Sequence, residues 1–334
     1  MKFRIRSAKK GDEEQLKKVS EAFHLCNLPK DISEIQKKIQ QSEQSFSGTL
    51  PFQKRGFLFV LEEVQTERLV GSSQILAYYT HQKHPYFIID QKISSLRLHY
   101  TKSDSVQLGG LVLLPEFRRG AEKLGRQIGA IRFLYMLEEP SIWPEEIEVS
   151  LTAPLKDNNT GSEFWDAVGK KVFSLNYREI SELYQKDFPG FLSQIPKSMT
   201  LDLKSLPSGA RRAVEEIHPE TLSLYHGLLK LGFKQTPLRH FLDGGISLIA
   251  KRTDVPFIAQ GKRVLVEAGH PAHPHPWLWS QQTEGVFTGG VIEGELNGEG
   301  LFISKEPLPD DMKPSIPCSV TPFNPLLPNY TDRS

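Results

Sequence analysis

Cysteine is scarce in this chain of 334 residues, which contains two, Cys26 and Cys318. Two cysteines so far apart argue against a disulfide framework and against a cysteine-ligated metal site. Long apolar runs are missing too, since no segment approaches the roughly 20 consecutive apolar residues that cross a bilayer. Residues 1–6 alternate charged and apolar side chains, unlike a signal peptide. We therefore expect a cytoplasmic protein with no membrane partner and no resident metal.

An excess of charge of one sign is also absent. The 41 Lys and Arg residues stand against 40 Asp and Glu, which leaves a net charge of +1. A chain without a strong overall field is a poor default partner for nucleic acid, although a local basic patch for a small phosphorylated ligand remains compatible with this balance. The composition is otherwise that of a globular protein, with 38% hydrophobic and 24% charged residues. The length suits two packed domains and a tail.

Strand and helix patterns alternate through the first 250 residues, which predicts an α/β fold. Phe3 to Ala8 alternate as a strand does, and Asp12 is a suitable N-cap for a helix that runs to Phe23. Asp31 stands before a second helical pattern that ends near residue 46. Further strands are expected at 56–61, 69–79, 86–89, 96–100, 106–114, 145–151, 198–203 and 246–250, and further helices at 122–138, 164–172, 208–216 and 221–231.

The region after Val255 has a different pattern, with β-like alternation at 263–267, 285–292 and 300–304, and it predicts a small all-β region. His270, His273 and His275 lie within it in a proline-punctuated segment, which favours a surface loop over a metal site. The last thirty residues contain seven prolines, so we expect this tail to be irregular.

The strand pattern at 106–114 is followed by Pro115, by the basic turn Arg118-Arg119-Gly120 and then by a helix. The N–H groups at a helix N-terminus suit a pyrophosphate, and neighbouring arginines add charge-assisted hydrogen bonds. This arrangement resembles the coenzyme A-binding segment of the GCN5-related N-acetyltransferase superfamily, whose pattern is Arg/Gln-x-x-Gly-x-Gly/Ala. The match is imperfect, because alanine or glutamate takes the place of the first glycine. An ordinary connection between strand and helix is the alternative.

A second motif occurs twice. The superfamily ends a later helix with a phrase such as Phe-Tyr-x-x-Leu-Gly-Phe, which resembles both 164–170 (Phe-Trp-Asp-Ala-Val-Gly-Lys) and 228–233 (Leu-Leu-Lys-Leu-Gly-Phe). Two copies, one in each half of the chain, favour an internal duplication of one α/β unit. Each copy alone would indicate a helix C-cap.

A third group of motifs resembles the arginine N-succinyltransferase family. Residues 217–221 read Ile-His-Pro-Glu-Thr where the family has Val-His-Pro-Gln-Thr, and 241–245 read Phe-Leu-Asp-Gly-Gly where it has Phe-Asp-Gly-Gly. Residues 169–177, Gly-Lys-Lys-Val-Phe-Ser-Leu-Asn-Tyr, are similar to its Gly-Lys-Arg-Phe-Phe-Ser-Met-Asp-Phe. The Leu-Pro pair at 50–51 and the strand at 56–62 also match. The chain is identified as a divergent member, with similarity from residue 3 to residue 250.

The resemblance implies tandem GCN5-related N-acyltransferase-like domains with a small β-rich C-terminal region. We expect an acyl-CoA-binding domain at 1–180, a second half with the catalytic residue at 181–254, the β-rich region at 255–305 and the proline-rich tail at 306–334. The family transfers a succinyl group from succinyl-CoA to the α-amine of arginine, in arginine catabolism. Small-molecule substrates are the implied partners, and a homodimer is expected by analogy.

The family's active-site histidine, a proton donor, falls on His218. Histidine exchanges protons near neutrality, as the reaction requires when an ammonium loses a proton and a thiolate gains one. A capping or packing role ahead of Pro219 is the alternative for this residue. The positions that the resemblance assigns to acyl-CoA are Leu111, which makes a main-chain contact, and Leu113, Arg118, Arg119, Gly120 and Gly125.

One departure from the family concerns the amine substrate. The family carries a glutamate in its Gly-Ser-Ser-Glu-Leu-Cys, and this chain has Gln107 there. Because a guanidinium is recognised by carboxylates, another amine or another acyl-CoA is an alternative. A degenerate coenzyme A-binding sensor without catalysis is a further one. Neither cysteine lies in a matched motif, which favours direct transfer over a covalent acyl-enzyme.

Overall fold

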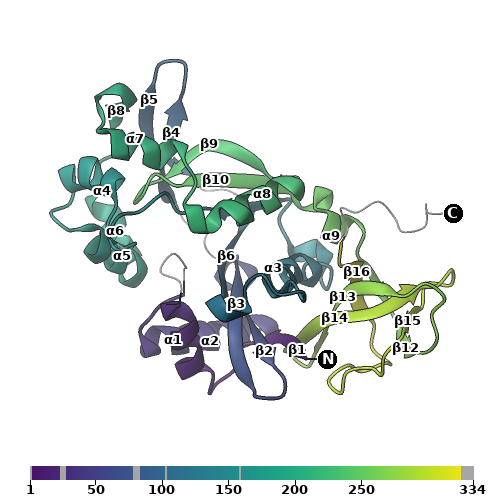
Figure 1. The fold of residues 1–334 in the computed structure, drawn as a ribbon. Helices are drawn as coiled ribbons and strands as arrows, with labels where there is room; N and C mark the ends of the chain where they lie inside the picture. The colour runs from purple at the N-terminus through teal and green to yellow at the C-terminus, as the bar shows by residue number, and fades with distance from the viewer. Residues whose placement is uncertain (1, 23–27, 78–82, 102–103, 158, 325–334) are drawn as a thin grey trace. The chain divides into compact units, whose positions relative to one another are not determined.

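The computed structural model describes residues 2–22, 28–77, 83–101, 104–157 and 159–324. The chain forms two compact units, each built from segments that are separate in sequence and can be followed by colour in Figure 1. Unit 1 comprises Met1–Tyr79, Val106–Glu145 and Lys251–Ser334, and unit 2 comprises Thr80–Ser105 and Glu146–Ala250. The four consecutive segments expected from the sequence cut across this division, and as domain boundaries they stay a prediction.

The strands of unit 1 lie in the order β11-β16-β13-β14-β1-β2-β3-β6, with antiparallel neighbours throughout. β15 pairs with β14 and, in parallel, with β12. β2 is buried over most of its length, which its unbroken apolar run predicts. The N-terminal strands are β1 (Phe3–Ser7), β2 (Gly56–Glu63), β3 (Arg68–Leu76) and β6 (Ser105–Leu113).

The helices of unit 1 are α1 (Glu13–Glu21), α2 (Ile32–Phe46), α3 (Leu124–Tyr135) and α9 (Pro256–Ala259). The Asp31 carboxylate accepts the N–H groups of two residues of the first turn of α2, which confirms the predicted cap. Asp12 holds the N-cap position of α1, but its carboxylate instead takes two hydrogen bonds from Arg6. Phe23, the expected end of the first helix, lies outside the described residues.

The strands of unit 2 lie in the order β7-β10-β9-β4-β5-β8. Phe164, Trp165, Phe191 and Phe241 are fully or almost fully buried in one hydrophobic cluster of this unit. The strands are β4 (His84–Asp90), β5 (Ser95–Thr101), β7 (Glu146–Ser150), β8 (Thr200–Asp202), β9 (Lys234–His240) and β10 (Ile246–Lys251). The helices are α4 (Glu163–Ala167), α5 (Tyr177–Lys186), α6 (Phe188–Gln194), α7 (Ser208–Glu215) and α8 (Leu222–Lys230).

The predicted alternation of strands and helices is confirmed, but three elements of unit 2 were not predicted. Helices α5 and α6 fill residues 177–194, where the sequence was not assigned a structure. Asn176 and Glu179 form a capping box at the start of α5, and this helix-start signal is present in the sequence. The strand β9 was overlooked because Pro237 interrupts its pattern.

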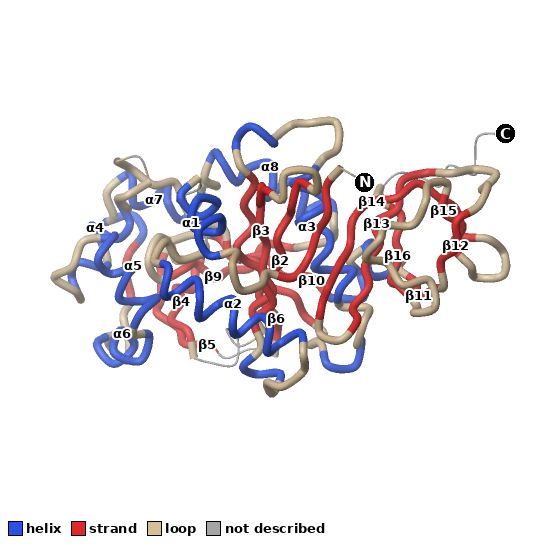
Figure 2. Tube along the Cα trace, turned by 90° about the horizontal axis from the view of Figure 1, so that it is seen from below, coloured by secondary structure: helices blue, strands red, loops and turns tan. Residues whose placement is uncertain are grey.

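The β-like pattern after Val255 is confirmed, and Figure 2 shows these strands in red, gathered beside one another. The prediction of an irregular tail is wrong for Cys318–Pro322, which form β16 between β11 and β13. One proline directly precedes this strand and another is its last residue. The residues between them keep their N–H groups, which remain available for pairing. The strands are β11 (Lys262–Val264), β12 (Val266–Ala268), β13 (His275–Thr283), β14 (Val286–Leu296), β15 (Phe302–Ser304) and β16.

Within the described part of the chain, none of the helices combines the length and the apolar character needed to cross a membrane.

Candidate functional site

β6 contains a β-bulge in the segment that the sequence assigns to coenzyme A. Its register against β3 shifts between Ser72 and Gln74, so two residues of β6 oppose Ser73. Gly110 has a φ of 57° there, and a Cβ at this position would lie 2.4 Å from Nε2 of Gln74. The bulge therefore requires glycine, both for its backbone conformation and for space.

Leu111 is the second residue of the bulge and Leu113 follows it, and both lie beneath α3. An ideal Cβ on Gly129 would be 3.8 Å from the Leu111 side chain, and one on Gly125 would be 3.7 Å from that of Leu113. The two glycines are four residues apart and so share one face of the helix. At these two positions α3 carries no side chain, and the side chains of Leu111 and Leu113 lie beside it. The structure thus brings three of the predicted residues, Leu111, Leu113 and Gly125, into one place.

The connection from β6 to α3 is an exposed basic turn. The Arg118 Nε donates to the Leu113 carbonyl at 2.9 Å, which holds this side chain against the end of the strand. Arg119 and Lys123 have φ values of 62° and 51°, in the left-handed region. The Lys123 N–H donates to the carbonyl of Gly120 at 3.1 Å, and α3 starts at the next residue.

The N-terminus of α3 fits an anion such as the phosphates of coenzyme A. The first N–H groups of a helix have no acceptor within the helix and carry partial positive charge. The first turn of α3 contains no acidic residue. Just before it, Arg118, Arg119 and Lys123 are exposed together with one carboxylate, that of Glu122. Lys123 was not singled out by the sequence pattern, although it lies in the turn.

Two further arginines of α3 point into the protein and are not part of this turn. The Arg126 Nη1 donates to Oδ1 of Asn324 at 2.7 Å, and its guanidinium lies over the rings of Phe257 and Phe323. Arg132 is buried, its Nε donates to a backbone carbonyl of the helix, and burial lowers its pKa to about 9.

His218 caps a short turn in unit 2. It precedes the 3-10 turn Pro219–Thr221, and its Nδ1 accepts the backbone N–H of Glu220 at 3.2 Å. A ring nitrogen that accepts a hydrogen bond carries no proton, so the proton of the neutral ring is on Nε2. Nε2 therefore donates to Oδ1 of Asn159, at 2.9 Å. The capping interaction and the position of the proton follow from the same geometry.

The surroundings of His218 favour the neutral ring. The residue is 5% exposed, and this burial lowers the pKa of His218, while the charges of Glu220 and Asp243 act in the opposite direction. Asn159 has a φ of 67°, and its Nδ2 donates to the carboxylate of Glu220 at 3.5 Å. Asn159 stands 59 residues before His218. No local pattern links the two residues, so the sequence alone does not indicate Asn159.

The Asp-Gly-Gly segment forms the turn between β9 and β10. The Asp243 carboxylate accepts the N–H of Gly245 at 2.9 Å and lies 3.2 Å from Nδ1 of His240. A Cβ on Gly245 would lie 2.1 Å from the carbonyl oxygen of Leu151. Close backbone packing explains this glycine.

The Leu-Gly-Phe segment at 228–233 ends α8. Gly232 has a φ of 91°, its N–H donates to Leu229, and the N–H of Phe233 donates to Leu228, both at 3.1 Å. This pattern is a Schellman C-cap, which accounts for the motif in this copy. The internal duplication stays a prediction.

The predicted coenzyme A residues all belong to unit 1, and His218 belongs to unit 2. For metals, the described residues contain no group of three or more His, Cys, Asp and Glu side chains that could hold an ion. Of the candidate histidines outside the site, His275 directs Nδ1 at the carbonyl of His273, 3.3 Å away. Cys26 lies outside the described residues, and Cys318 is buried.

Comparison with known families and proteins gives a consistent result. The model of the family described as "Arginine N-succinyltransferase beta subunit" matches residues 3–256. The chain is 26% identical over 267 residues to the arginine N-succinyltransferase subunit alpha of Pseudomonas aeruginosa, which covers 76% of this chain and 79% of that protein. It is 25% identical to the arginine N-succinyltransferase of an Enterobacter species, covering 76% of each.

The fold agrees with that of a solved relative. The structure of arginine/ornithine succinyltransferase subunit AI from Pseudomonas aeruginosa superposes with a TM-score of 0.77 at 20% identity and covers 96% of this chain and 98% of that one. This confirms the α/β fold class that the sequence predicts. The family match extends over about three quarters of the chain, from the first strand to α9. The chain is therefore an N-acyltransferase that belongs to the arginine N-succinyltransferase family.

Proposed function

We propose that the protein transfers the succinyl group of succinyl-CoA to the α-amine of L-arginine, giving coenzyme A and N2-succinyl-L-arginine. The observation that carries this proposal is the family match over residues 3–256, which includes the segments around Leu111 and His218. Relatives at 24–26% identity are named for the same activity. The role in arginine catabolism rests on this kinship.

The acyl donor is assigned to unit 1. The β-bulge at Gly110 and Leu111 interrupts the pairing of β6, and the basic turn leads into the N-terminus of α3. A bulge next to a site commonly redirects the backbone toward a ligand. The main chain at Leu111 would contact the amide-rich arm of coenzyme A. Arg118, Arg119 and the first N–H groups of α3 would hold its phosphates.

Transfer requires two proton movements. The α-ammonium of arginine loses a proton, the free amine attacks the thioester carbonyl carbon, the C–S bond breaks, and the departing thiolate gains a proton. We assign the last step to the imidazolium form of His218, which donates its Nε2 proton to the thiolate and becomes neutral. Because Nδ1 is also protonated in that form, it must first release the hydrogen bond from the N–H of Glu220. In this structure the Nε2 proton is directed at Asn159, and a bound thioester would replace that acceptor.

The test measures thiol release from succinyl-CoA in the presence of arginine for wild type, His218→Asn and His226→Asn. Asparagine is a good N-cap, so His218→Asn keeps an acceptor for the turn and removes the Nε2 proton. We expect kcat to fall by about 100-fold or more in this variant. His226 is exposed on α8 and controls for loss of a histidine in the same region. A kcat of His218→Asn equal to that of wild type would contradict the assignment.

A second candidate is an acyltransferase of the same fold that acts on another amine. Gln107 favours it, because an amide stands where the family carries a carboxylate. The solved relative in Pseudomonas aeruginosa is named for both arginine and ornithine. Parallel assays with arginine, ornithine and a polyamine decide between the two. Turnover with ornithine and not with arginine would select this candidate, and coenzyme A binding without turnover would indicate a sensor.

A further inference from the structure

Unit 2 contains a buried arginine that the transfer described above does not use. Arg239 lies near the end of β9 and is 2% exposed. Its Nε donates to the carbonyl of Val214 at 2.6 Å, and its Nη1 donates to the carbonyls of Thr236 and Leu238 at 3.0 and 2.9 Å. These bonds use the single N–H group of Nε and both N–H groups of Nη1. The guanidinium is held rigidly, and its Nη2 edge remains for another acceptor.

The backbone of β9 is shaped around this guanidinium. The pairing with β10 shifts between Ile246 and Leu248, opposite Arg239 and Gln235, so three residues of β9 oppose one of β10. Pro237 lies in the middle of this irregularity. Proline has no backbone N–H, and at this position the regular pairing of the two strands is already interrupted. The bulge turns the two neighbouring carbonyls toward Nη1. Bulges of this kind are enriched beside functional sites, where they aim a side chain.

No carboxylate in the described part of the chain forms an ion pair or hydrogen bond with Arg239, whose partners are three carbonyls. Burial lowers the pKa of Arg239, and the more distant charge of Glu215 acts in the opposite direction. A buried cation without an anion costs stability, because carbonyl dipoles replace only part of its hydration. An anionic ligand at Nη2 would offset this cost.

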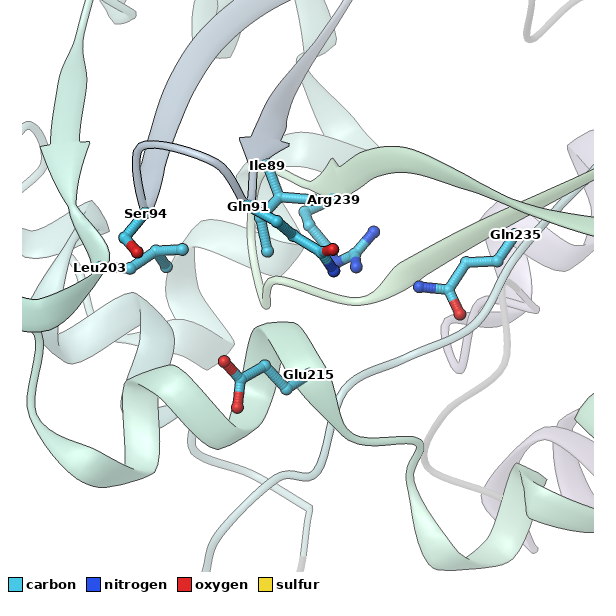
Figure 3. Close-up of a pocket in the computed structure, with 7 residues that line it drawn as sticks. All are labelled: Ile89, Gln91, Ser94, Leu203, Glu215, Gln235 and Arg239. Atoms are coloured by element: carbon cyan, nitrogen blue, oxygen red, sulfur yellow. The ribbon is translucent and has the colours of Figure 1, made fainter.

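Arg239 lines a cavity of about 310 Å³ within unit 2, shown in Figure 3. A neighbouring cavity of about 740 Å³ is also lined by Arg239 and includes Lys92 and Arg97. Volumes of roughly 300–1,000 Å³ are typical of small-molecule sites. The smaller cavity is lined by Ile89, Gln91, Ser94, Leu203, Glu215, Gln235 and Arg239.

The smaller cavity is lined by a cationic side chain, an anionic side chain and neutral amides. Figure 3 shows Arg239 on a strand and Glu215 on a helix, with the amides of Gln91 and Gln235 as further lining groups. Arg239 offers the two diverging N–H groups of Nη2, and a carboxylate can take a charge-assisted hydrogen bond from one of them. Glu215 is exposed at the C-terminal end of α7 and offers a carboxylate to a cation. A ligand that carries one charge of each sign matches this arrangement.

We propose that the cavity at Arg239 binds the carboxylate of a small zwitterion of the amino-acid type, whose cationic group faces Glu215. None of the residues assigned to acyl transfer lines this cavity. Binding at this cavity therefore depends on the residues that line it and not on the reaction proposed above.

Isothermal titration calorimetry of the full chain with L-arginine, agmatine and succinate tests the proposal. Agmatine is arginine without its carboxylate, and succinate has carboxylates without a cation. We expect L-arginine to bind at least 10-fold more tightly than agmatine, because a charge-assisted pair is lost. If succinate binds instead, with the same dependence on Arg239, the site takes the carboxylate of an acyl group, and the zwitterion proposal is overturned.

Three variants complete the test. Arg239→Lys should weaken L-arginine at least 10-fold, and Glu215→Gln should weaken L-arginine but leave succinate unchanged. Arg212→Gln, an exposed charge on α7 that does not line the cavity, should bind as wild type does. If Arg239→Lys fails to fold by circular dichroism, the exposed Glu215 variant still decides. Binding of L-arginine that is equal in all variants, or absent in wild type, overturns the proposal. His218→Asn should keep this binding and lose only turnover, which separates the site from the proposed reaction.

Discussion

The hydrogen bond between His218 and Asn159 makes a measurable prediction about the charge of the histidine. Asn159→Asp replaces a neutral acceptor, 2.9 Å from Nε2, by a carboxylate. A negative charge this close stabilises the imidazolium, so the pKa of His218 should rise. In wild type, burial acts in the opposite direction and lowers this pKa.

The size of the rise follows from Coulomb's law. Two unit charges about 4 Å apart attract by roughly 4 kcal/mol at an effective dielectric constant of about 20. Each pH unit corresponds to about 1.4 kcal/mol, which sets an upper bound of about 3 units. Asn159 is half-buried, and solvent weakens the attraction, so we expect a rise of about 1 to 3 pH units. The imidazolium gives up the bond from Glu220 to Nδ1 in wild type and variant alike, so this cost lowers both pKa values and leaves the rise between them unchanged.

The assay is an NMR titration of the ring nitrogens in 15N-histidine-labelled protein, with Asn159→Ala as the control that removes the acceptor without adding charge. Wild type should show the Nε2–H tautomer at neutral pH. The His218 pKa should be higher in Asn159→Asp than in Asn159→Ala. In the same variant, the fall of kcat at alkaline pH should move to higher pH if His218 is the proton donor. Equal pKa values in the two variants, or an Nδ1–H tautomer in wild type, would refute the reasoning.

Other predictions concern the bulge, the buried thiol and a buried acid. Gly110→Ala should lower the free energy of unfolding in urea by about 1–3 kcal/mol, because φ is positive and the Gln74 side chain occupies the space. Gly298→Ala is the control and should change the stability little, because the space around Gly298 is open. Burial raises the pKa of Cys318 to about 12, so in a Cys26→Ser background a thiol reagent at pH 8 should label the protein only after denaturation; rapid labelling of the native protein would contradict this. Burial also raises the pKa of Glu148, so the native state keeps that proton to higher pH than the unfolded state, and stability should fall as pH rises through this interval. Glu148→Gln should flatten that dependence, and an unchanged pH dependence would argue against it.

Local patterns predicted much of the fold because their signals lie within a few residues of one another. The Asp31 cap, the hairpin of β2 and β3 and the strand–turn–helix of β6 and α3 are all local in sequence. The tail was mispredicted because proline content describes a segment as a whole. Pairing of β16 with β11 and β13 depends instead on where the prolines stand, which leaves Ser319 to Thr321 free to form the ladder.

The residues of the two candidate sites show the same contrast between local signals and contacts that only the fold creates. The motif around His218 is contiguous, so the sequence alone suggests both a capping role, which the structure shows, and a catalytic role, which stays a prediction. Asn159 was not found, because 59 residues separate it from His218 and only the fold joins them. Arg239 shows the limit most clearly. Its sequence neighbours include Pro237, which reads as a break in a strand. Only in the folded sheet does that break become a bulge whose carbonyls hold a buried guanidinium, so the feature that hid the strand is the one that shapes the cavity.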